Sequence, residues 1–159
     1  MHTVQLLLKP SKYERYEIDR RFRALAHLHN VCVKHARKCM VHLQYDKDYA
    51  ALRQQYLELS KKLSKKEELS KEDKAEKKAL SAQLAERRSA YGLSKSALEC
   101  YLKVCGKQFS KLLSSQQVQT EADRVWCGVE KCLFGNGKVL RFKRFIDFDT
   151  IGGKSNKNG

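Results

Sequence analysis

The chain has 159 residues and a net charge of +15 at pH 7, and it contains no run of about 18 apolar residues that could span a membrane. Its length fits one ordinary domain, or a helical module plus a fragment of another, and a compact chain of this size needs no disulfide bonds. The charge favours a polyanionic partner, first of all nucleic acid, and the lack of a charged-then-apolar leader predicts a cytoplasmic protein without a membrane partner.

A short β-prone segment opens the chain, since residues 3–8 read Thr-Val-Gln-Leu-Leu-Leu before Lys9-Pro10. Ser11 and Glu14 then have the spacing of a capping box, which predicts the start of a long helix. We expect His29, on the apolar stripe of this helix, to be a hydrogen-bonded core residue. The stripe consists of Ile18, Phe22, Leu25, Cys32, Ala36, Met40 and Leu43. The cations of the opposite, basic face are Arg20, Arg23, Lys34 and Lys38.

Four further helices follow along the chain. One is predicted from about Asp46 to Lys66, and the next from Ser70, as its cap, to Tyr91, before Gly92. The mixed lysines and glutamates at 61–78 are interpreted as the solvated tip of this helical hairpin. A fourth helix is capped by Ser94, with Leu93 and Leu98 as a hydrophobic staple. The fifth begins after Ser114-Ser115 and ends at Gly135.

The closing residues 135–159 change pattern, because aromatic and β-branched residues alternate with cations. Such alternation is typical of a strand with one packed face and one face toward phosphate, so its cations are candidate nucleic-acid contacts. They are Lys138, Arg141, Lys143, Arg144, Lys154 and Lys157. Asn158-Gly159 is a hairpin-turn dipeptide with no second strand after it, which predicts an unfinished sheet and an incomplete chain.

No catalytic or metal-binding set is predicted. The six cysteines include no Cys-x-x-Cys pair, so they are expected to be reduced and to pack as small apolar residues. The prediction is therefore a mainly α fold, a bundle of about five helices inserted between short strands of an incomplete β-barrel-like domain. Its parts are residues 1–10 as a first strand, 11–135 as the helical domain and 136–159 as the return to the β domain.

Seventeen positions near the end of the chain carry a resemblance to transposon-encoded RNA-guided nucleases of the TnpB type, relatives of type V CRISPR effectors. These positions are Trp126, Val129, Glu130, Lys131, Leu133, Phe134, Gly135, Gly137, Lys138, Arg141, Phe142, Lys143, Gly153, Lys154, Ser155, Asn156 and Lys157. The opening strand, Lys9-Pro10 and the long helix also match how these proteins begin.

The resemblance implies that residues 1–10 and 136–159 belong to a wedge-type β-barrel and that 11–135 are recognition helices. It implies binding of a structured guide RNA and target DNA in a prokaryotic cell, with a nuclease half that could be encoded separately. No RuvC-like domain follows, so no cleavage is assigned to this chain, and no cofactor is expected in it, since Mg²⁺ belongs to the nuclease domain. The alternative is a small basic helical module for protein–protein interaction.

Overall fold

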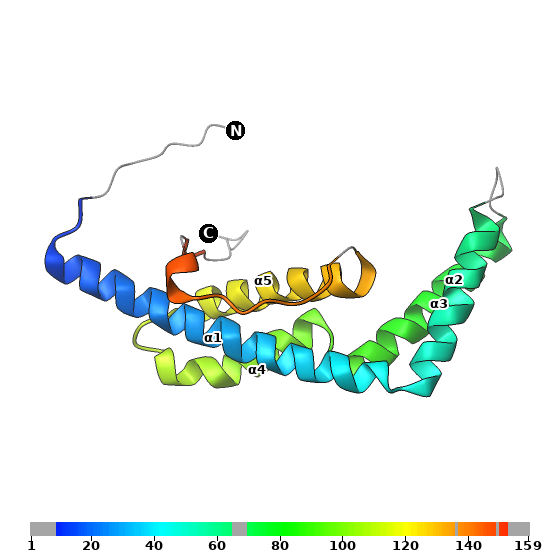
Figure 1. The fold of residues 1–159 in the computed structure, drawn as a ribbon, viewed down its shortest axis with the longest axis horizontal. Coiled ribbons are helices and arrows are strands. Elements are labelled where there is room, and N and C mark those ends of the chain that lie inside the picture. Colours follow the sequence, from blue (N-terminus) through cyan, green and yellow to red (C-terminus); the bar gives the residue numbers. More distant parts are fainter. Residues whose placement is uncertain (1–8, 65–69, 136, 149, 153–159) are drawn as a thin grey trace.

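The computed structural model describes residues 9–64, 70–135, 137–148 and 150–152. Its α-helices are α1 (Lys12–Gln44), α2 (Lys47–Leu63), α3 (Lys71–Ala90), α4 (Lys95–Gly106) and α5 (Ser115–Phe134), with short 3₁₀ helices η1 (Lys107–Phe109) and η2 (Phe145–Asp147). Helices α1, α4 and α5 pack together as the body of the molecule. Helices α2 and α3 form an arm that projects from one end of this body (Figure 1).

Side-chain caps explain where the helices begin. Ser11 and Glu14 form the predicted capping box, with the Ser11 N–H donating to the Glu14 carboxylate at 2.8 Å. Ser70 and Ser94 also cap α3 and α4 as predicted. Between these two helices Gly92 has φ = 74°, a left-handed backbone that favours glycine and lets the chain turn from the arm back to the body. Local sequence thus sets the helix boundaries.

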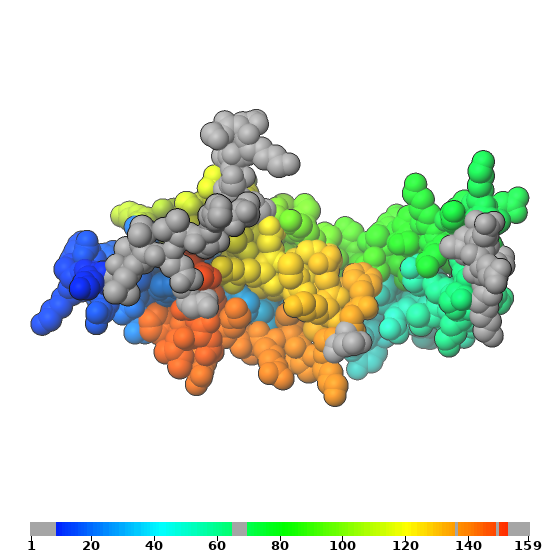
Figure 2. Space-filling view, turned by 90° about the horizontal axis from the view of Figure 1, so that it is seen from above, coloured from blue at the N-terminus to red at the C-terminus, as the bar shows by residue number. Residues whose placement is uncertain are grey.

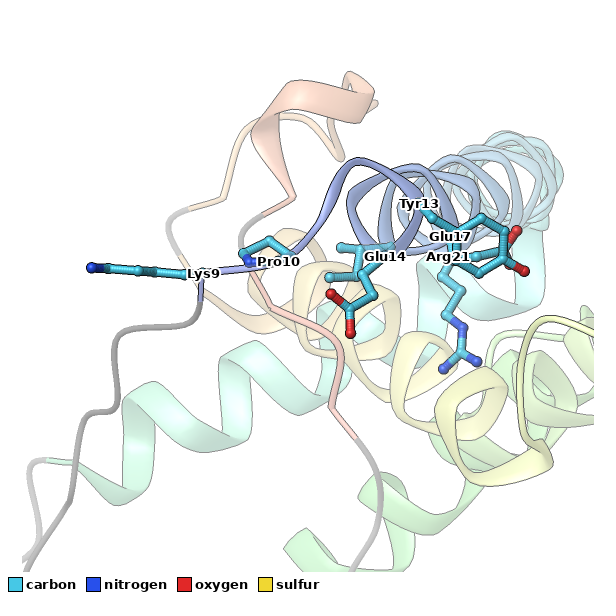
Figure 3. Close-up of a pocket in the computed structure, with 7 residues that line it drawn as sticks. Lys9, Pro10, Tyr13, Glu14, Glu17 and Arg21 are labelled. Carbon is cyan, nitrogen blue, oxygen red and sulfur yellow. The ribbon is translucent and has the colours of Figure 1, made fainter.

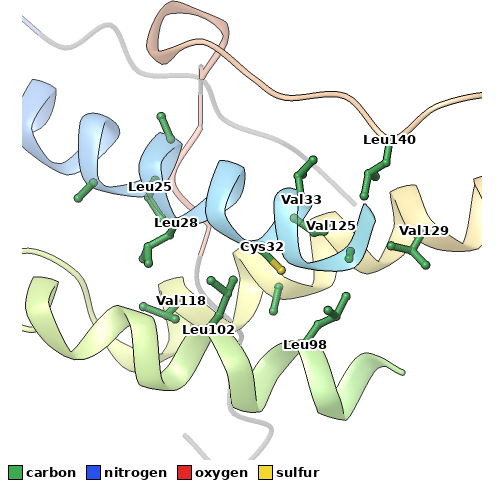
Figure 4. Close-up of a cluster of buried hydrophobic side chains, with 14 of the residues drawn as sticks. Leu25, Leu28, Cys32, Val33, Leu98, Leu102, Val118, Val125, Val129 and Leu140 are labelled. Carbon is green, nitrogen blue, oxygen red and sulfur yellow. The ribbon is translucent and has the colours of Figure 1, made fainter. Parts of the chain in front are cut away.

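One apolar core joins the three helices of the body. Cys32 lies on α1, Leu98 and Leu102 on α4, and Val125 and Val129 on α5, and all five are at most 1% exposed (Figure 4). Of the predicted stripe, Leu25, Cys32, Ala36 and Leu43 are buried, and Phe22 and Met40 are half-buried. Ile18 is instead exposed, as are residues 11–16 before it, so the first turns of α1 extend beyond the core.

The prediction that the end of the chain returns to a β domain is wrong for residues 137–148, the main part of that region that the structure describes. The structure is mainly helical, and residues 137–148 contain extended backbone and η2 but no strand. A strand needs a neighbour that completes its ladder of hydrogen bonds, and no second strand lies beside this segment among the described residues. The predicted strand at 3–8 lies outside the described residues, and the division into three parts stays a prediction.

No described helix combines the length and the apolar character that crossing a membrane requires.

Candidate nucleic-acid interface

Residues 137–148, here called the closing segment, run back from the end of α5 along the body (Figures 1 and 2). The turn begins at the end of α5, where the N–H groups of Gly135 and Gly137 both donate to the Lys131 carbonyl, at 3.1 and 3.0 Å. Leu140 then enters the core and is 7% exposed (Figure 4). It lies over Gly128, where a Cβ atom would be 2.6 Å from the Leu140 Cδ1 atom. The glycine therefore leaves room for the leucine.

Asn30 holds the middle of the closing segment on α1. Its Nδ2 group donates to the Lys143 carbonyl at 2.8 Å, while its Oδ1 atom accepts from the Lys143 N–H at 2.9 Å. One side chain thus satisfies both backbone groups of one residue, as a neighbouring strand would do. The pairing fixes which residues of the segment lie beside which turn of α1.

Two arginines of α1 lie over aromatic rings of the closing segment, one before and one after Lys143. The Arg37 guanidinium lies 5.2 Å from the Phe142 ring centroid, and the Arg23 guanidinium lies 4.4 Å from that of Phe145. Since Phe142 meets Arg37 and Phe145 meets Arg23, the segment runs antiparallel to α1. Such contacts stabilise a cation by about 0.5–1 kcal/mol at exposed sites and hold the guanidinium groups in place on the surface.

A buried polar network supports the far end of the segment. The His29 Nδ1 atom lies 2.6 Å from Glu121 Oε1, and Arg124 donates to Glu121 Oε2 at 3.1 Å and to the Thr150 carbonyl at 3.2 Å. Phe148, which is 8% exposed, meets the His29 ring edge to face. The prediction that His29 is a hydrogen-bonded core residue is confirmed.

All predicted cations within the described residues are exposed. Through its contacts with Arg23, Asn30 and Arg37, the closing segment lies along the helix that carries the other group. The cations of α1 are Arg20, Arg23, Lys34 and Lys38, and those of the closing segment are Lys138, Arg141, Lys143 and Arg144. At 100° per residue the four on α1 fall within a sector of about 60°, which also lies beside Asn30. Lys154 and Lys157 lie outside the described residues. We call the eight predicted cations that the structure describes, together with Arg37, the basic surface.

Sequence reasoning missed two members of this site, Arg37 and Asn30. On the helical wheel, Arg23, Asn30 and Arg37 recur every seven residues and so form one row along α1. This spacing could have shown that the three side chains contact one and the same neighbouring segment. The wheel could not show that the neighbour is the closing segment, because that contact joins residues more than 100 positions apart.

Two members of the basic surface have acidic partners. Arg20 pairs with Glu17 at 2.9 Å, and Arg144 pairs with Asp147 at 3.2 Å. The hydrogen bonds that Arg144 donates lower the pKa of Asp147, so that carboxylate stays charged and offsets Arg144. The other seven form no ion pair with a described carboxylate: Arg23, Lys34, Arg37, Lys38, Lys138, Arg141 and Lys143. Their charges remain available to an anionic ligand.

No group of three or more His, Cys, Asp or Glu side chains among the described residues could hold a metal ion. A hollow at the start of α1 is lined by Lys9, Tyr13 and Arg21 together with Glu14 and Glu17 (Figure 3). Both carboxylates already have partners, Glu14 in the capping box and Glu17 in the ion pair with Arg20. This hollow therefore presents no free pair of carboxylates for acid–base chemistry.

No protein-family model, no curated protein and no solved structure matches this chain.

Proposed function

We propose that this chain is a nucleic-acid-binding module that holds a structured RNA on its basic surface. One observation carries the proposal: seven cations from α1 and the closing segment share one region of the body without an ion pair to a described carboxylate. Neutralising phosphates with lysine and arginine releases bound counterions from the nucleic acid, which is the main source of such affinity.

The aromatic rings on this surface favour backbone contact over base stacking. Phe142 and Phe145 are covered by Arg37 and Arg23, and Phe148 is buried with the Lys143 ammonium 5.2 Å from its ring. Phe145 is half-buried and Phe148 is buried, so neither is open to an unpaired base, whereas Phe142 is 51% exposed and has Arg37 over one face. The surface therefore fits the phosphates of a folded RNA, read by shape rather than by sequence.

We further propose that the module serves a transposon-encoded RNA-guided nuclease of the TnpB type in a prokaryotic cytoplasm, with target DNA as a second partner. This part rests on the sequence resemblance near the end of the chain. It assigns RNA holding to the chain and no cleavage.

Fluorescence anisotropy with a labelled RNA hairpin over a salt series tests the RNA proposal. The unmodified chain should bind at about 50 mM salt, and its affinity should fall steeply as the salt concentration rises. In the variant Lys34→Gln, Lys38→Gln, Arg141→Gln and Lys143→Gln, the slope of log K against log[salt] should be smaller by about 3, since each phosphate contact accounts for roughly 0.7–0.9.

The matched control changes four exposed lysines away from the basic surface, Lys61, Lys62, Lys107 and Lys111, to glutamine. It removes the same net charge and should keep most of the wild-type slope. Absence of RNA binding by the unmodified chain, or equal slopes for the two variants, would contradict the proposal and favour a protein-interaction module.

A further inference from the structure

Most charges in the first two turns of α3 fall on two opposite sides of the helix. On α3, Lys71, Lys74 and Lys78 fall within a sector of about 60° at 100° per residue. Glu72, Asp73 and Glu76 fall on the opposite side, within about 100°. Lys77 falls between the two groups, about 40° from Asp73, so the separation covers six of these seven charges.

Two of the hollows between α2 and α3 differ in the charges that line them. One groove is lined by Tyr56 of α2 and by Lys74, Lys77, Lys78 and Ser81 of α3, with Ala82 and Ala85, and no carboxylate lines it. The other is lined by Glu58 and Glu76 together with Lys62. We call the first the lysine groove. The arm thus offers a purely cationic groove on one side and a mixed one on the other.

We propose that the lysine groove is a second contact for the phosphate backbone of the RNA that the basic surface holds. This inference rests on the proposed function, because it takes that RNA as the ligand. Protein interfaces are depleted in lysine and depend on aromatic or arginine anchors, and the one ring here, Tyr56, already has the Lys77 ammonium 5.7 Å from its centroid. Ser81, Ala82 and Ala85 keep the floor of the groove low, so that a bulky polyanion can approach the lysines.

The position of the groove sets the size of the ligand. Lys77 is 13 residues from the end of α3 at Ala90, so the groove lies roughly 20 Å out along the arm, at about 1.5 Å per residue. The basic surface is built on α1 and the closing segment, and the arm projects away from the body to which they belong (Figure 1). A ligand that contacts both must therefore be extended, as a folded RNA is, whereas a mononucleotide or a free phosphate can occupy only one.

The test uses the full chain and two RNA probes, a hairpin with a stem of about 24 base pairs and a single-stranded fragment of about six nucleotides. In the variant Lys74→Gln, Lys77→Gln and Lys78→Gln, the salt slope for the hairpin should be smaller by about 2, and affinity near 0.1 M salt should fall roughly 10- to 100-fold. Affinity for the fragment, which the basic surface can bind alone, should change less than twofold.

Two variants control for charge and fold. The first control variant, Lys61→Gln, Lys62→Gln and Lys111→Gln, removes the same charge outside the lysine groove and should keep the wild-type salt slope. The second, Lys74→Arg, Lys77→Arg and Lys78→Arg, keeps the positive charge of the groove and should bind the hairpin as the unmodified chain does. If the unmodified chain binds the hairpin but the lysine-groove variant matches the charge control, the second contact is wrong while the proposed function stands. That result would point to an acidic protein as the partner of the arm. If the unmodified chain binds no RNA, the proposed function itself fails.

Discussion

Asn30 is the residue on which the alignment of the two halves of the basic surface depends. Its amide is both donor and acceptor, so it can satisfy the N–H and the carbonyl of Lys143 together. No carboxylate or ammonium at this position could do both. The cations Arg23 and Arg37 lie in the same row of α1, seven residues to either side of Asn30, each over a ring of the closing segment.

We predict that Asn30→Ala lowers the free energy of unfolding by about 1 kcal/mol, since a hydrogen bond contributes about 0.5–1.5 kcal/mol and alanine returns a few tenths in helix propensity. Urea unfolding followed by circular dichroism measures the loss. RNA affinity should also fall, because Lys143 and Arg141 are no longer held beside α1. A more stable variant would show that helix propensity outweighs the pairing and that Asn30 does not hold the segment.

At the scale of elements, the junction between α1 and the arm depends on Asp46. Its Oδ1 atom accepts the Tyr49 N–H at 3.0 Å as the N-cap of α2, and its Oδ2 atom lies 3.6 Å from Arg87 Nη1 on α3. Arg87 also pairs with Asp48. One side chain thus caps one helix of the arm and attracts the other.

We predict that acid weakens this junction. The hydrogen bond from the Tyr49 N–H, followed by the hydrogen bond with the Tyr91 side chain and then by the charge of Arg87, lowers the pKa of Asp46 in the folded chain. Stability from this group is therefore present above its unfolded pKa of about 3.9 and is lost as the pH falls through the lower folded pKa. Asp46→Asn keeps a capping oxygen but does not titrate.

Thermal unfolding between pH 6 and pH 2 checks this, since the midpoint of Asp46→Asn should fall less than that of the unmodified chain. Asp48→Asn, which removes a charge beside Arg87 without removing the cap, is the matched control. Parallel midpoints for wild type and Asp46→Asn would show that protonation of Asp46 does not matter to the fold.

The molecule as a whole consists of a well-packed body and a lightly packed arm. In the described part of the arm helices, Leu63 and Leu84 are the buried residues, whereas the body has a continuous cluster that includes Leu28, Leu98 and Leu102. Local stability follows the number of buried apolar contacts. The arm should therefore open more readily than the body, which suits an element that reaches toward an extended ligand.

Amide hydrogen exchange tests this difference. Amides of α2 and α3 should exchange faster than those of α1, α4 and α5, and Leu84→Ala should speed exchange in the arm while leaving the body protected. Leu98→Ala is the contrasting variant, because a cavity in the body should speed exchange in all five helices. Equal protection in arm and body of the unmodified chain would contradict the division.

The helices and the residues that begin them follow from local sequence patterns. Serine caps, Gly92 and the apolar stripes act over a few residues, so Ser11, Ser70 and Ser94 could be placed from local spacing alone. The basic face of α1 followed from the same periodicity, and the exposure of Arg20, Arg23, Lys34 and Lys38 agrees with it. Local pattern also placed His29 in the core.

The conformation of the closing segment, in contrast, depends on its packing against α1 and α5. Its alternating pattern predicted a strand, but alternation records only that one side packs, and it does not say whether the neighbour is a sheet or a pair of helices. Here Leu140 packs over Gly128 of α5 and Lys143 pairs with Asn30 of α1, so helices provide both the packing and the hydrogen bonds that a sheet would have supplied. Contacts across more than 100 residues depend on the packed fold, and local spacing does not carry them.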